Sequence, residues 1–469
     1  MRDLLAPPVS GQWHETWGLL LALLLVVAIG VLPLKAALAV IAGGAALLLT
    51  AIDPVYGLAA LALAVPYGDL AQLSVGGFAV GGTEVITTAV AIAFVGWLSR
   101  HGGERWPWPL GPTAVFFGFV AFSATLAPNL GLGLKEGLKG LELMVAFAVA
   151  ASVARTRRDL AIVVGALVVA AVAEAALGWY QFIGHVGPTG FLLSEGVLRA
   201  YGSFGQPNPY AGYIGLSIPL LFGLLLAKAL PEKGGWLLAG ALALLVGALV
   251  MSFSRGAWLA FAGMAAVVLA AHRPRWAPAM VGIGIVGVAV LAIGAFDALP
   301  SVISGRLASL TQVFSIVDIR RDVPTDQNWA VFERMVNWQA AWDMFQANPW
   351  LGVGLGNFGV FFEQFALPPW RNYTGHAHNY YLNLLAEGGA IGLALYAIMM
   401  ASWLALLASV IRRRRTGDDA LGYGVALGAL GAVVALSLHN VFDNLYVHGM
   451  SVQVGLLLGL AASATRERP

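Results

Sequence analysis

Long apolar runs, separated by short polar stretches, follow one another along almost the whole chain. Each run has about 16 to 25 residues, enough for a helix to cross roughly 30 Å of hydrocarbon. Leu, Ala and Gly dominate the runs, and the ten-residue alternation typical of a membrane β-barrel strand is absent. The pattern therefore predicts membrane-spanning helices at 17–33, 35–52, 54–67, 84–99, 112–127, 136–154, 159–183, 209–227, 235–252, 256–271, 276–296, 379–411, 419–441 and 446–463.

The composition supports a membrane protein. Of the 469 residues, 59% are hydrophobic and 11% are charged, whereas roughly a quarter of the residues of a soluble domain are charged. The mean hydropathy is +0.80. The chain has no cysteine, which excludes disulfides, thiolate metal sites and a cysteine nucleophile. We predict an all-α, polytopic membrane bundle of about 12 to 14 transmembrane helices.

The basic residues predict the orientation of the bundle. If successive spans cross the membrane in alternating directions, most basic residues of the short loops lie on the same side of the membrane as the run Arg412 to Arg415. The positive-inside rule assigns that side, with both termini, to the cytoplasm. The segments 184–208 and 297–378 then lie on the outer side.

The outer segment 297–378 is long enough to need an ordered structure. Apolar residues recur in it at helical spacing from Trp329 to Phe345, and Leu351 to Phe365 is expected to form a second short helix. The tryptophans of this segment are typical of an aromatic belt at the membrane interface, and stacking against sugars is their alternative role. The predicted organisation is transmembrane helices over 1–296 with the outer loop 184–208, a helical outer cap over 297–378, and C-terminal transmembrane helices over 379–469.

The densest polar cluster lies where the cap re-enters the membrane and reads H-A-H-N-Y-Y-L-N-L-L-A-E-G-G-A-I-G, from His376 to Gly392. A histidine at a water–membrane boundary titrates near neutrality and can act as a general base or acid. Metal binding is an alternative, but H-x-H has no third ligand of the right type nearby in the sequence. In a purely structural alternative, His376 caps the helix and Asn379 satisfies free backbone amides.

Outer arginines form a second candidate group. Arg199 precedes a turn fixed by glycine and proline, R-A-Y-G-S-F-G-Q-P-N-P-Y, where its planar guanidinium could grip a phosphate. Arg255, in S-F-S-R-G, and Arg306, in S-G-R-L-A-S-L, add two cations on the same side. Three arginines against the positive-inside trend suggest a bound polyanion, whereas snorkelling at the interface is the structural alternative.

Further polar residues have several interpretations. Lys135 and Lys139, at another outer helix start, either enlarge the cationic patch or pair with Glu142. Glu174 lies well inside a predicted span, where a carboxylate is by default functional or paired. A neutral Glu174 bonded to another helix is the alternative. A last polar group fits no metal or triad spacing: His439, Asn440, Asp443, Asn444 and His448.

Several short motifs lie along the chain. His378-Asn379, then nine residues, then G-A-I-G ending at Gly392 forms the pattern H-N-x9-G-x-x-G. The others are G-W-Y-Q at Gly178 to Gln181, R-x-x-G-S-F-x-x-P-N at Arg199 to Asn208, S-R-G at Ser254 to Gly256 and N-P-W-L-G-V-G-L-G-N-F at Asn348 to Phe358. In these motifs the chain resembles the O-antigen ligase and polymerase superfamily of bacterial membrane glycosyltransferases.

The resemblance implies a GT-C-like fold and a glycan transfer from undecaprenyl pyrophosphate to an acceptor hydroxyl at the periplasmic face of a bacterial inner membrane. It implies no cofactor, metal, nucleotide sugar or nucleic acid. His378 would be catalytic, and attack opposite the pyrophosphate predicts inversion. Arg199 and Arg306 would hold the pyrophosphate, and the other cap arginines that could replace Arg306 are Arg320, Arg321 and Arg334. The predicted substrate-binding set is completed by Arg255, His376, Asn379, Asn208 and Glu174.

No sequence feature names the acceptor. An O-antigen ligase acting on lipid A core is favoured, and an O-antigen or exopolysaccharide polymerase and a protein O-oligosaccharyltransferase share the donor. The other expected partners are membrane lipids. A small-anion transporter is the alternative of another class, but it predicts charges deep in several spans, whereas only Glu174 is clearly deep.

Overall fold

The computed structural model describes residues 34–70, 72–75, 78–102, 106–193, 196–293, 303–304, 319, 329–368 and 375–463. The predicted all-α class is confirmed. A small hairpin of β1 (Leu73–Val75) and β2 (Phe78–Val80) is also present. The predicted span 17–33 lies outside the described residues, and every other predicted span coincides with a helix.

Seven of the described helices are long and apolar enough to cross a membrane. The chain is therefore a multi-pass membrane protein. The helices of the bundle are α2 (Leu34–Ile52), α3 (Pro54–Ala64), α4 (Gly82–His101), α5 (Leu110–Leu126), α6 (Leu130–Val153), α7 (Arg157–Gly184), α8 (Pro207–Leu226), α9 (Glu232–Met251), α10 (Arg255–His272), α11 (Ala277–Ile293), α15 (Tyr380–Arg414), α16 (Ala420–His439) and α17 (Met450–Ser463). Short 3-10 turns occupy Gly68–Leu70, Thr189–Phe191 and Pro274–Trp276.

Side-chain caps set several helix starts. At α7, the backbone N–H of Asp159 donates to the Thr156 hydroxyl at 3.1 Å, and the Thr156 N–H donates back to the Asp159 carboxylate at 2.8 Å. This reciprocal pair satisfies two amides that the first turn leaves without partners. Asn129 caps α6 in a similar way by accepting from the N–H of Leu132 at 3.2 Å.

Small residues let the central helices approach closely. A Cβ placed at Gly428 of α16 would lie 2.7 Å from the Cα of Leu220 in α8, so only glycine fits there. A Cβ at Gly459 of α17 would lie 2.6 Å from the Phe147 carbonyl of α6. Such small-residue contacts drive helix association in membranes, where the hydrophobic effect does not act between helices. Two pairs, α8 with α16 and α6 with α17, are thus closely packed.

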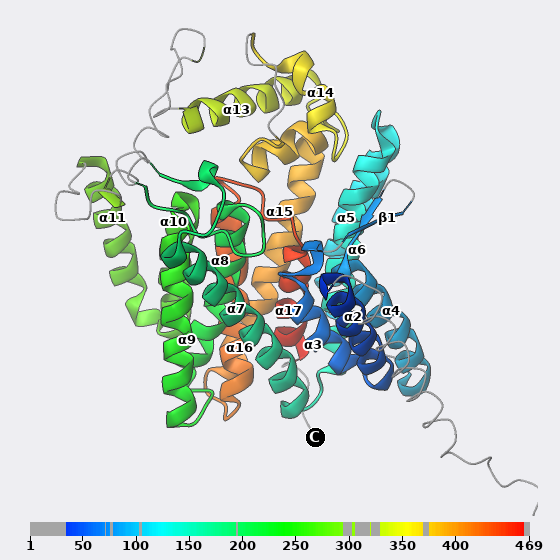
Figure 1. Ribbon diagram of the computed structural model, residues 1–469, viewed down its shortest axis with the longest axis vertical. Helices are drawn as coiled ribbons and strands as arrows, with labels where there is room; N and C mark the ends of the chain where they lie inside the picture. Colours follow the sequence, from blue (N-terminus) through cyan, green and yellow to red (C-terminus); the bar gives the residue numbers. More distant parts are fainter. Residues whose placement is uncertain are drawn as a thin grey trace, which may run out of the picture.

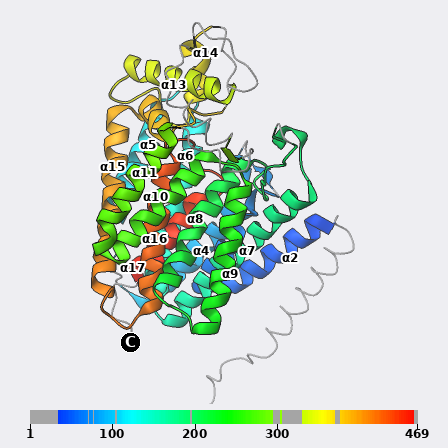
Figure 2. The ribbon, with the colours of Figure 1, turned by 90° about the vertical axis from the view of Figure 1, so that its left-hand side faces the viewer.

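The helices lie in three groups (Figure 1). Helices α8, α9 and α10 occupy one flank and α4, α5 and α6 the other, with α15, α16 and α17 between them. Two further helices, α13 (Trp329–Ala347) and α14 (Phe358–Phe365), lie across one end of the bundle, where α15 begins, as both views show (Figures 1 and 2). These two helices form the described part of the predicted cap.

The expected helix over Leu351 to Phe365 is wrong in its first half. The structure places its start at Phe358, because Gly352, Gly354 and Gly356 all have a positive φ and interrupt any helix. The interrupted segment is a tight loop that packs beneath α13. Apolar residues of this loop, α13, α14 and the start of α15 share one small core: Val336, Ala340, Ala341, Met344, Val353, Phe358, Phe362, Ala366, Ala377 and Ala386.

Helix α15 is broken near its start. Gly389 has φ 62° and ψ −165°, which is not helical. The loop between α13 and α14 fills the break and satisfies the backbone groups that it frees. Four backbone hydrogen bonds join them: Ala390 N to Pro349 O at 2.8 Å, Ile391 N to Trp350 O at 3.3 Å, Val353 N to Ala386 O at 2.9 Å and Gly354 N to Glu387 O at 2.9 Å.

Candidate active site

The two histidines of the H-A-H-N motif lie immediately before α15. The side chain of Asn379 caps this helix by accepting from the N–H of Leu382 at 3.0 Å. His378 adopts a left-handed conformation with φ 50°, and its N–H donates to Nδ1 of His376 at 3.0 Å. The turn therefore presents both rings on one side, with their centroids 4.4 Å apart. The capping role foreseen for this region belongs to Asn379.

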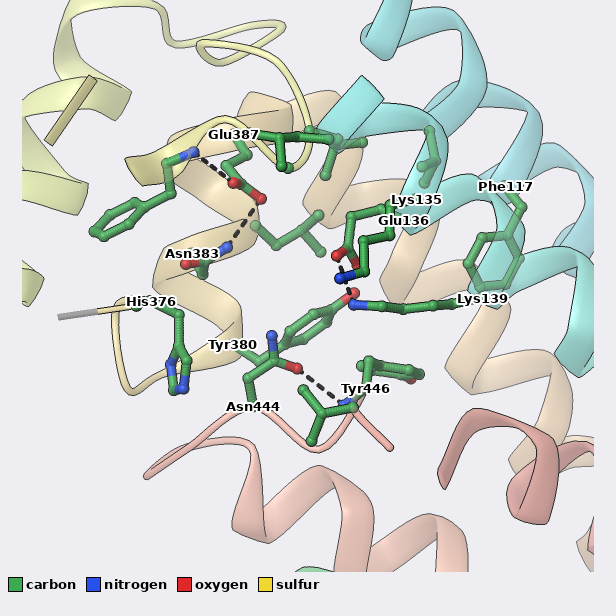
Figure 3. Close-up of a pocket in the computed structure, with 18 of the residues that line it drawn as sticks. Phe117, Lys135, Glu136, Lys139, His376, Tyr380, Asn383, Glu387, Asn444 and Tyr446 are labelled. Carbon is green, nitrogen blue, oxygen red and sulfur yellow. Dashed lines mark hydrogen bonds and ion pairs between the residues drawn. The ribbon is translucent and has the colours of Figure 1, made fainter. Parts of the chain in front are cut away.

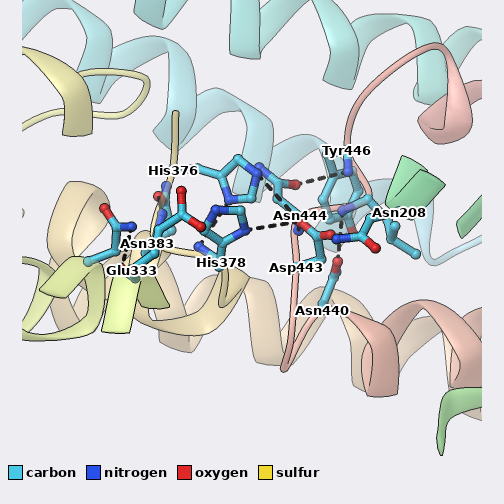
Figure 4. Close-up of polar contacts among 12 residues, drawn as sticks. Asn208, Glu333, His376, His378, Asn383, Asn440, Asp443, Asn444 and Tyr446 are labelled. Carbon is cyan, nitrogen blue, oxygen red and sulfur yellow. Dashed lines mark hydrogen bonds and ion pairs between the residues drawn. The ribbon is translucent and has the colours of Figure 1, made fainter. Parts of the chain in front are cut away.

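A carboxylate from a distant part of the chain faces both histidines. Asp443 lies in the turn between α16 and α17, and its Oδ1 is 3.4 Å from His376 Nε2 and 3.7 Å from His378 Nδ1 (Figure 4). Burial raises the pKa of Asp443, but the neighbouring histidines more than offset this and hold the pKa well below its usual range. Asp443 is therefore a permanent anion that can orient an imidazole and stabilise its protonated form.

The environment of His376 disfavours the charged ring. Burial, opposed in part by Asp443, lowers the pKa of His376 to about 4. The neighbouring His378, Arg334 and Lys139 lower the pKa further, so two permanent cations, Arg334 and Lys139, lie near the same ring. His376 is consequently neutral at physiological pH, in agreement with its Nδ1 accepting a hydrogen bond.

This shift predicts a pH-dependent stability. Between the unfolded pKa of about 6.5 and the folded value of about 4, the unfolded chain binds more protons at this residue. The stability is therefore expected to fall as the pH is lowered through this window. Thermal midpoints of the purified protein across it should fall less in His376→Gln than in wild type. The exposed His185 provides the control, and a His185→Gln variant that flattened the profile equally would contradict the assignment.

The structure also brings together three side chains that could bind a metal ion. His376, His378 and Asp443 each offer one atom, and these atoms lie within 4.8 Å of one another. The expectation that H-x-H lacks a third ligand was therefore wrong, because folding brings Asp443 to the motif. A carboxylate beside a histidine pair suits both a metal ion and metal-free acid–base chemistry, so chelation must be a variable in any assay.

Arg199 is held by the last residue of its own motif and by the segment before the S-R-G motif. Its Nε donates to the carbonyl of Ser252 at 2.8 Å, and its Nη2 donates to Oδ1 of Asn208 at 2.9 Å. The S-R-G motif that follows Ser252 packs against α16, because a Cβ at Gly256 would lie 3.3 Å from the ring of His439. The loop after Arg199 reaches the turn that holds Asp443, since the Phe204 and His448 rings are 5.6 Å apart.

Glu174 and Gln181 of α7 position the loop that follows Arg199. Glu174 is fully buried, and its Oε2 accepts from the N–H of Ser203 at 3.1 Å. Gln181 accepts from the N–H groups of Gly202 and Tyr201 at 2.7 and 3.1 Å, and donates to the Gly202 carbonyl at 2.9 Å. The G-W-Y-Q motif thus fixes the backbone behind Arg199. Glu174 does not line the cavity described next.

A polar cavity of about 250 Å³ lies beside the histidines. Figure 3 shows His376 on one side of it and Lys139 extending from α6 on the other. The ammonium of Lys139 pairs with Glu136 at 2.6 Å. The other polar side chains that line it come from α6, α15 and the turn after α16: Lys135, Tyr380, Asn383, Glu387, Asn444 and Tyr446.

Asn383 and Glu387 tie the histidine turn to the cap. The Ala377 N–H donates to Oδ1 of Asn383 at 3.1 Å, and Nδ2 of Asn383 donates to Glu387 at 2.9 Å. The other oxygen of Glu387 accepts from the N–H of Phe358, the first residue of α14, at 2.7 Å. The i, i+4 spacing of Asn383 and Glu387 was visible in the sequence, but their partners were not.

The structure brings some predicted site residues together. His376 lines the cavity, and His378 lies against its ring. Arg199 and Asn208 lie on the α8 side, and Arg255 begins α10. Arg306, Arg320 and Arg321 lie outside the described residues. Asp443 and the cap residue Arg334 are charges near the histidines. From the sequence, Arg334 was predicted only as a possible replacement for Arg306, and Asp443 had no assigned role.

Comparison with known proteins agrees with the site. Residues 240–397 match the family model described as O-antigen ligase. The matched segment contains Arg255, the loop between α13 and α14, and both histidines, whereas Arg199 and Asp443 lie outside it. A search among curated proteins found no match. Over residues 240–397 the chain is therefore similar to the O-antigen ligase family, which supports the resemblance to the O-antigen ligase and polymerase superfamily.

Proposed function

We propose that the protein is an O-antigen ligase that transfers a glycan from undecaprenyl pyrophosphate to a hydroxyl group of lipid A core. The reaction is metal-independent and takes place at the periplasmic face of a bacterial inner membrane, with both termini in the cytoplasm. The observation that carries this proposal is the His378–Asp443 pair beside a polar cavity that Lys135 and Lys139 line. The donor and the acceptor are those that the resemblance to the superfamily implies.

His378 would act as the general base. Asp443 faces its Nδ1, which leaves Nε2 for the acceptor hydroxyl. As the hydroxyl oxygen bonds to the anomeric carbon, its proton passes to Nε2, and the bond from that carbon to the phosphate oxygen breaks. The electron pair leaves on the pyrophosphate. The separation of 3.7 Å between His378 and Asp443 is expected to shorten when substrate binds, as is usual for catalytic hydrogen bonds.

The leaving pyrophosphate needs cations where its charge develops. Arg199, Arg255 and Arg306 are the proposed groups. Arg334 of α13 is a further candidate, because its charge contributes to the lowered pKa of His376. A cap arginine at this position would hold the pyrophosphate close to the histidines. His376, Asn208 and Asn379 complete the proposed site, and Glu174 supports it by positioning the Arg199 loop.

Glycan transfer by the purified full-length protein tests the proposal. The assay offers undecaprenyl-pyrophosphate glycan and lipid A core, with and without EDTA, to wild type and Asp443→Asn. We expect capped lipid A core from wild type in both buffers. Asp443→Asn should be at least about a hundredfold slower, since an orienting carboxylate contributes this much or more in related triads. Asp418→Asn, in an exposed turn, is the matched control.

Each other outcome points to a different function. Loss of transfer with EDTA would assign the histidines and Asp443 to a metal ion. Longer lipid-linked chains without capping would indicate a polymerase, and a glycosylated Ser or Thr would indicate a protein O-oligosaccharyltransferase. Absence of any transfer by wild type would contradict the proposed function and favour the small-anion transporter.

A further inference from the structure

A second, larger cavity adjoins the one beside the histidines. It has a volume of about 850 Å³ and lies between α4, α6 and the turn before α17. Lys135, Lys139, Tyr446 and Val447 line both cavities. The two spaces therefore adjoin at these side chains, and a ligand in the larger one could extend toward His376.

The walls of the larger cavity are mainly apolar. Val85 of α4 is 42% exposed, and Leu138 and Leu141 of α6 are 50% and 54% exposed. Ala91 and Val145 line the cavity farther along the same two helices. Because α4 is one of the helices that can cross a membrane, this exposed apolar groove faces hydrocarbon. A groove of this kind suits the hydrocarbon chain of a lipid.

Two lysines lie where this groove meets the smaller cavity. Lys139 is paired with Glu136, and its side chain extends into the smaller cavity (Figure 3). Within the described part of the chain, Lys135 has no hydrogen-bond or ion-pair partner. Glu84, the groove's carboxylate on α4, accepts the N–H of Gly81 at 2.8 Å and so serves as a helix cap. The lysines are thus placed to bind a phosphate.

The lysines and Arg199 lie on opposite flanks of the bundle. Arg199 is hydrogen-bonded to Asn208 at the start of α8 and to Ser252 at the end of α9, and the lysines belong to α6 (Figure 1). The histidines precede α15, between these flanks. A transfer reaction needs two substrates that meet at one base. If the arginines hold the donor pyrophosphate, the lysine side is left for the acceptor.

We propose that the α4–α6 groove, with Lys135 and Lys139, binds the acceptor, and that this acceptor is a phosphorylated glycolipid. A hydrocarbon chain lies in the groove, a phosphate binds the two lysines, and the sugar extends into the polar cavity beside His376. Asn383 and Asn444 supply amide groups for its hydroxyls. This inference rests on the proposed function for the identity of the reaction, but the site itself can be tested without turnover.

Equilibrium binding to the full-length protein in phosphatidylcholine nanodiscs tests the site. The probes are lipid A core, the same glycolipid after removal of its phosphates, and undecaprenyl pyrophosphate. Lys139→Gln should weaken binding of lipid A core about tenfold, which corresponds to the binding free energy lost with one charge-assisted hydrogen bond. The dephosphorylated probe should bind wild type and variant equally weakly. Undecaprenyl pyrophosphate should bind both equally well.

A second pair of variants tests the groove. Ala91→Trp fills it and should weaken binding of lipid A core, whereas Ile92→Trp, on a 69% exposed neighbouring position outside the cavity, should not.

Because Lys139→Gln leaves Glu136 unpaired, the double variant Glu136→Gln/Lys139→Gln replaces the single variant in the binding test if the single variant does not fold.

Two results would overturn the assignment. One is weaker binding of undecaprenyl pyrophosphate to the lysine variants, which would make this the donor site. The other is unchanged binding of lipid A core in all variants. Lipid binding as expected, without any glycan transfer, would instead contradict the proposed function alone.

Discussion

Replacing His378 by alanine is expected to lower the rate of glycan transfer by about 10²- to 10⁴-fold, the usual contribution of a general base. The ring lies against His376, and its Nδ1 faces the Asp443 carboxylate. His376 also faces Asp443 through Nε2, but its Nδ1 already accepts the N–H of His378, so His376 is poorly placed to replace His378 as the base. Donor binding should change little, because the proposed phosphate-binding groups are the arginines. The measurement is the single-turnover rate at saturating donor and acceptor.

The control must separate chemistry from backbone strain. His378 has φ 50°, a conformation that alanine adopts less readily than histidine or asparagine. His185 is exposed and has φ 49°, so His185→Ala removes the same side chain from the same backbone conformation. It should retain full transfer. His378→Asn, which tolerates a positive φ, should be as slow as His378→Ala with an unchanged thermal midpoint. Full activity in His378→Asn would exclude the histidine as base.

The periodic part of the fold was predictable from sequence. Each predicted span in the described residues is a helix, because a membrane requires long apolar segments whose backbone bonds are satisfied internally. The cap helix Trp329–Ala347 was also predictable from the spacing of its apolar residues. The loop over 349–357 was not, since its apolar residues resemble a helix and only the tertiary contacts of its glycines reveal a turn.

The candidate site was only half predictable. His376 and His378 could be found from the sequence, because they lie two residues apart and are polar in a largely apolar chain. Asp443 was noted in the sequence but left without a role, because its partners lie on another helix and no spacing rule links the two turns. The function of Glu174 was equally hidden. Its hydrogen bond to Ser203 shows that a deep carboxylate can act through the loop that it holds.

Gly389 gives the H-N-x9-G-x-x-G motif a physical meaning. In the pattern H-N-x9-G-x-x-G, this residue is the first glycine, and it breaks α15 so that the cap loop can insert. The break places the hydrogen-bonded chain of Asn383 and Glu387 between the histidine turn and α14. The signature therefore encodes the attachment of the cap to the histidine turn as well as the proposed base.

Gly389→Ala should accordingly be one of the most damaging single substitutions in the protein. Its φ of 62° with ψ of −165° is a conformation that only glycine adopts readily, and forcing another residue into it costs about 1–3 kcal/mol. A Cβ there would also collide with the backbone of Trp350, which cannot move without losing its hydrogen bond to Ile391. We expect a loss of several kcal/mol in total and, with the cap displaced, little glycan transfer.

The neighbouring glycine provides the comparison. A Cβ at Gly388 would meet its nearest atom, on Leu384, at 3.4 Å, which is ordinary contact, so Gly388→Ala should fold with a nearly unchanged thermal midpoint. Thermal unfolding in detergent and the yield of monodisperse protein measure the difference. If both alanine variants were equally stable, the cap loop would not depend on the break in α15. If Gly389→Ala folded stably but lost transfer, the break would act on the catalytic turn alone.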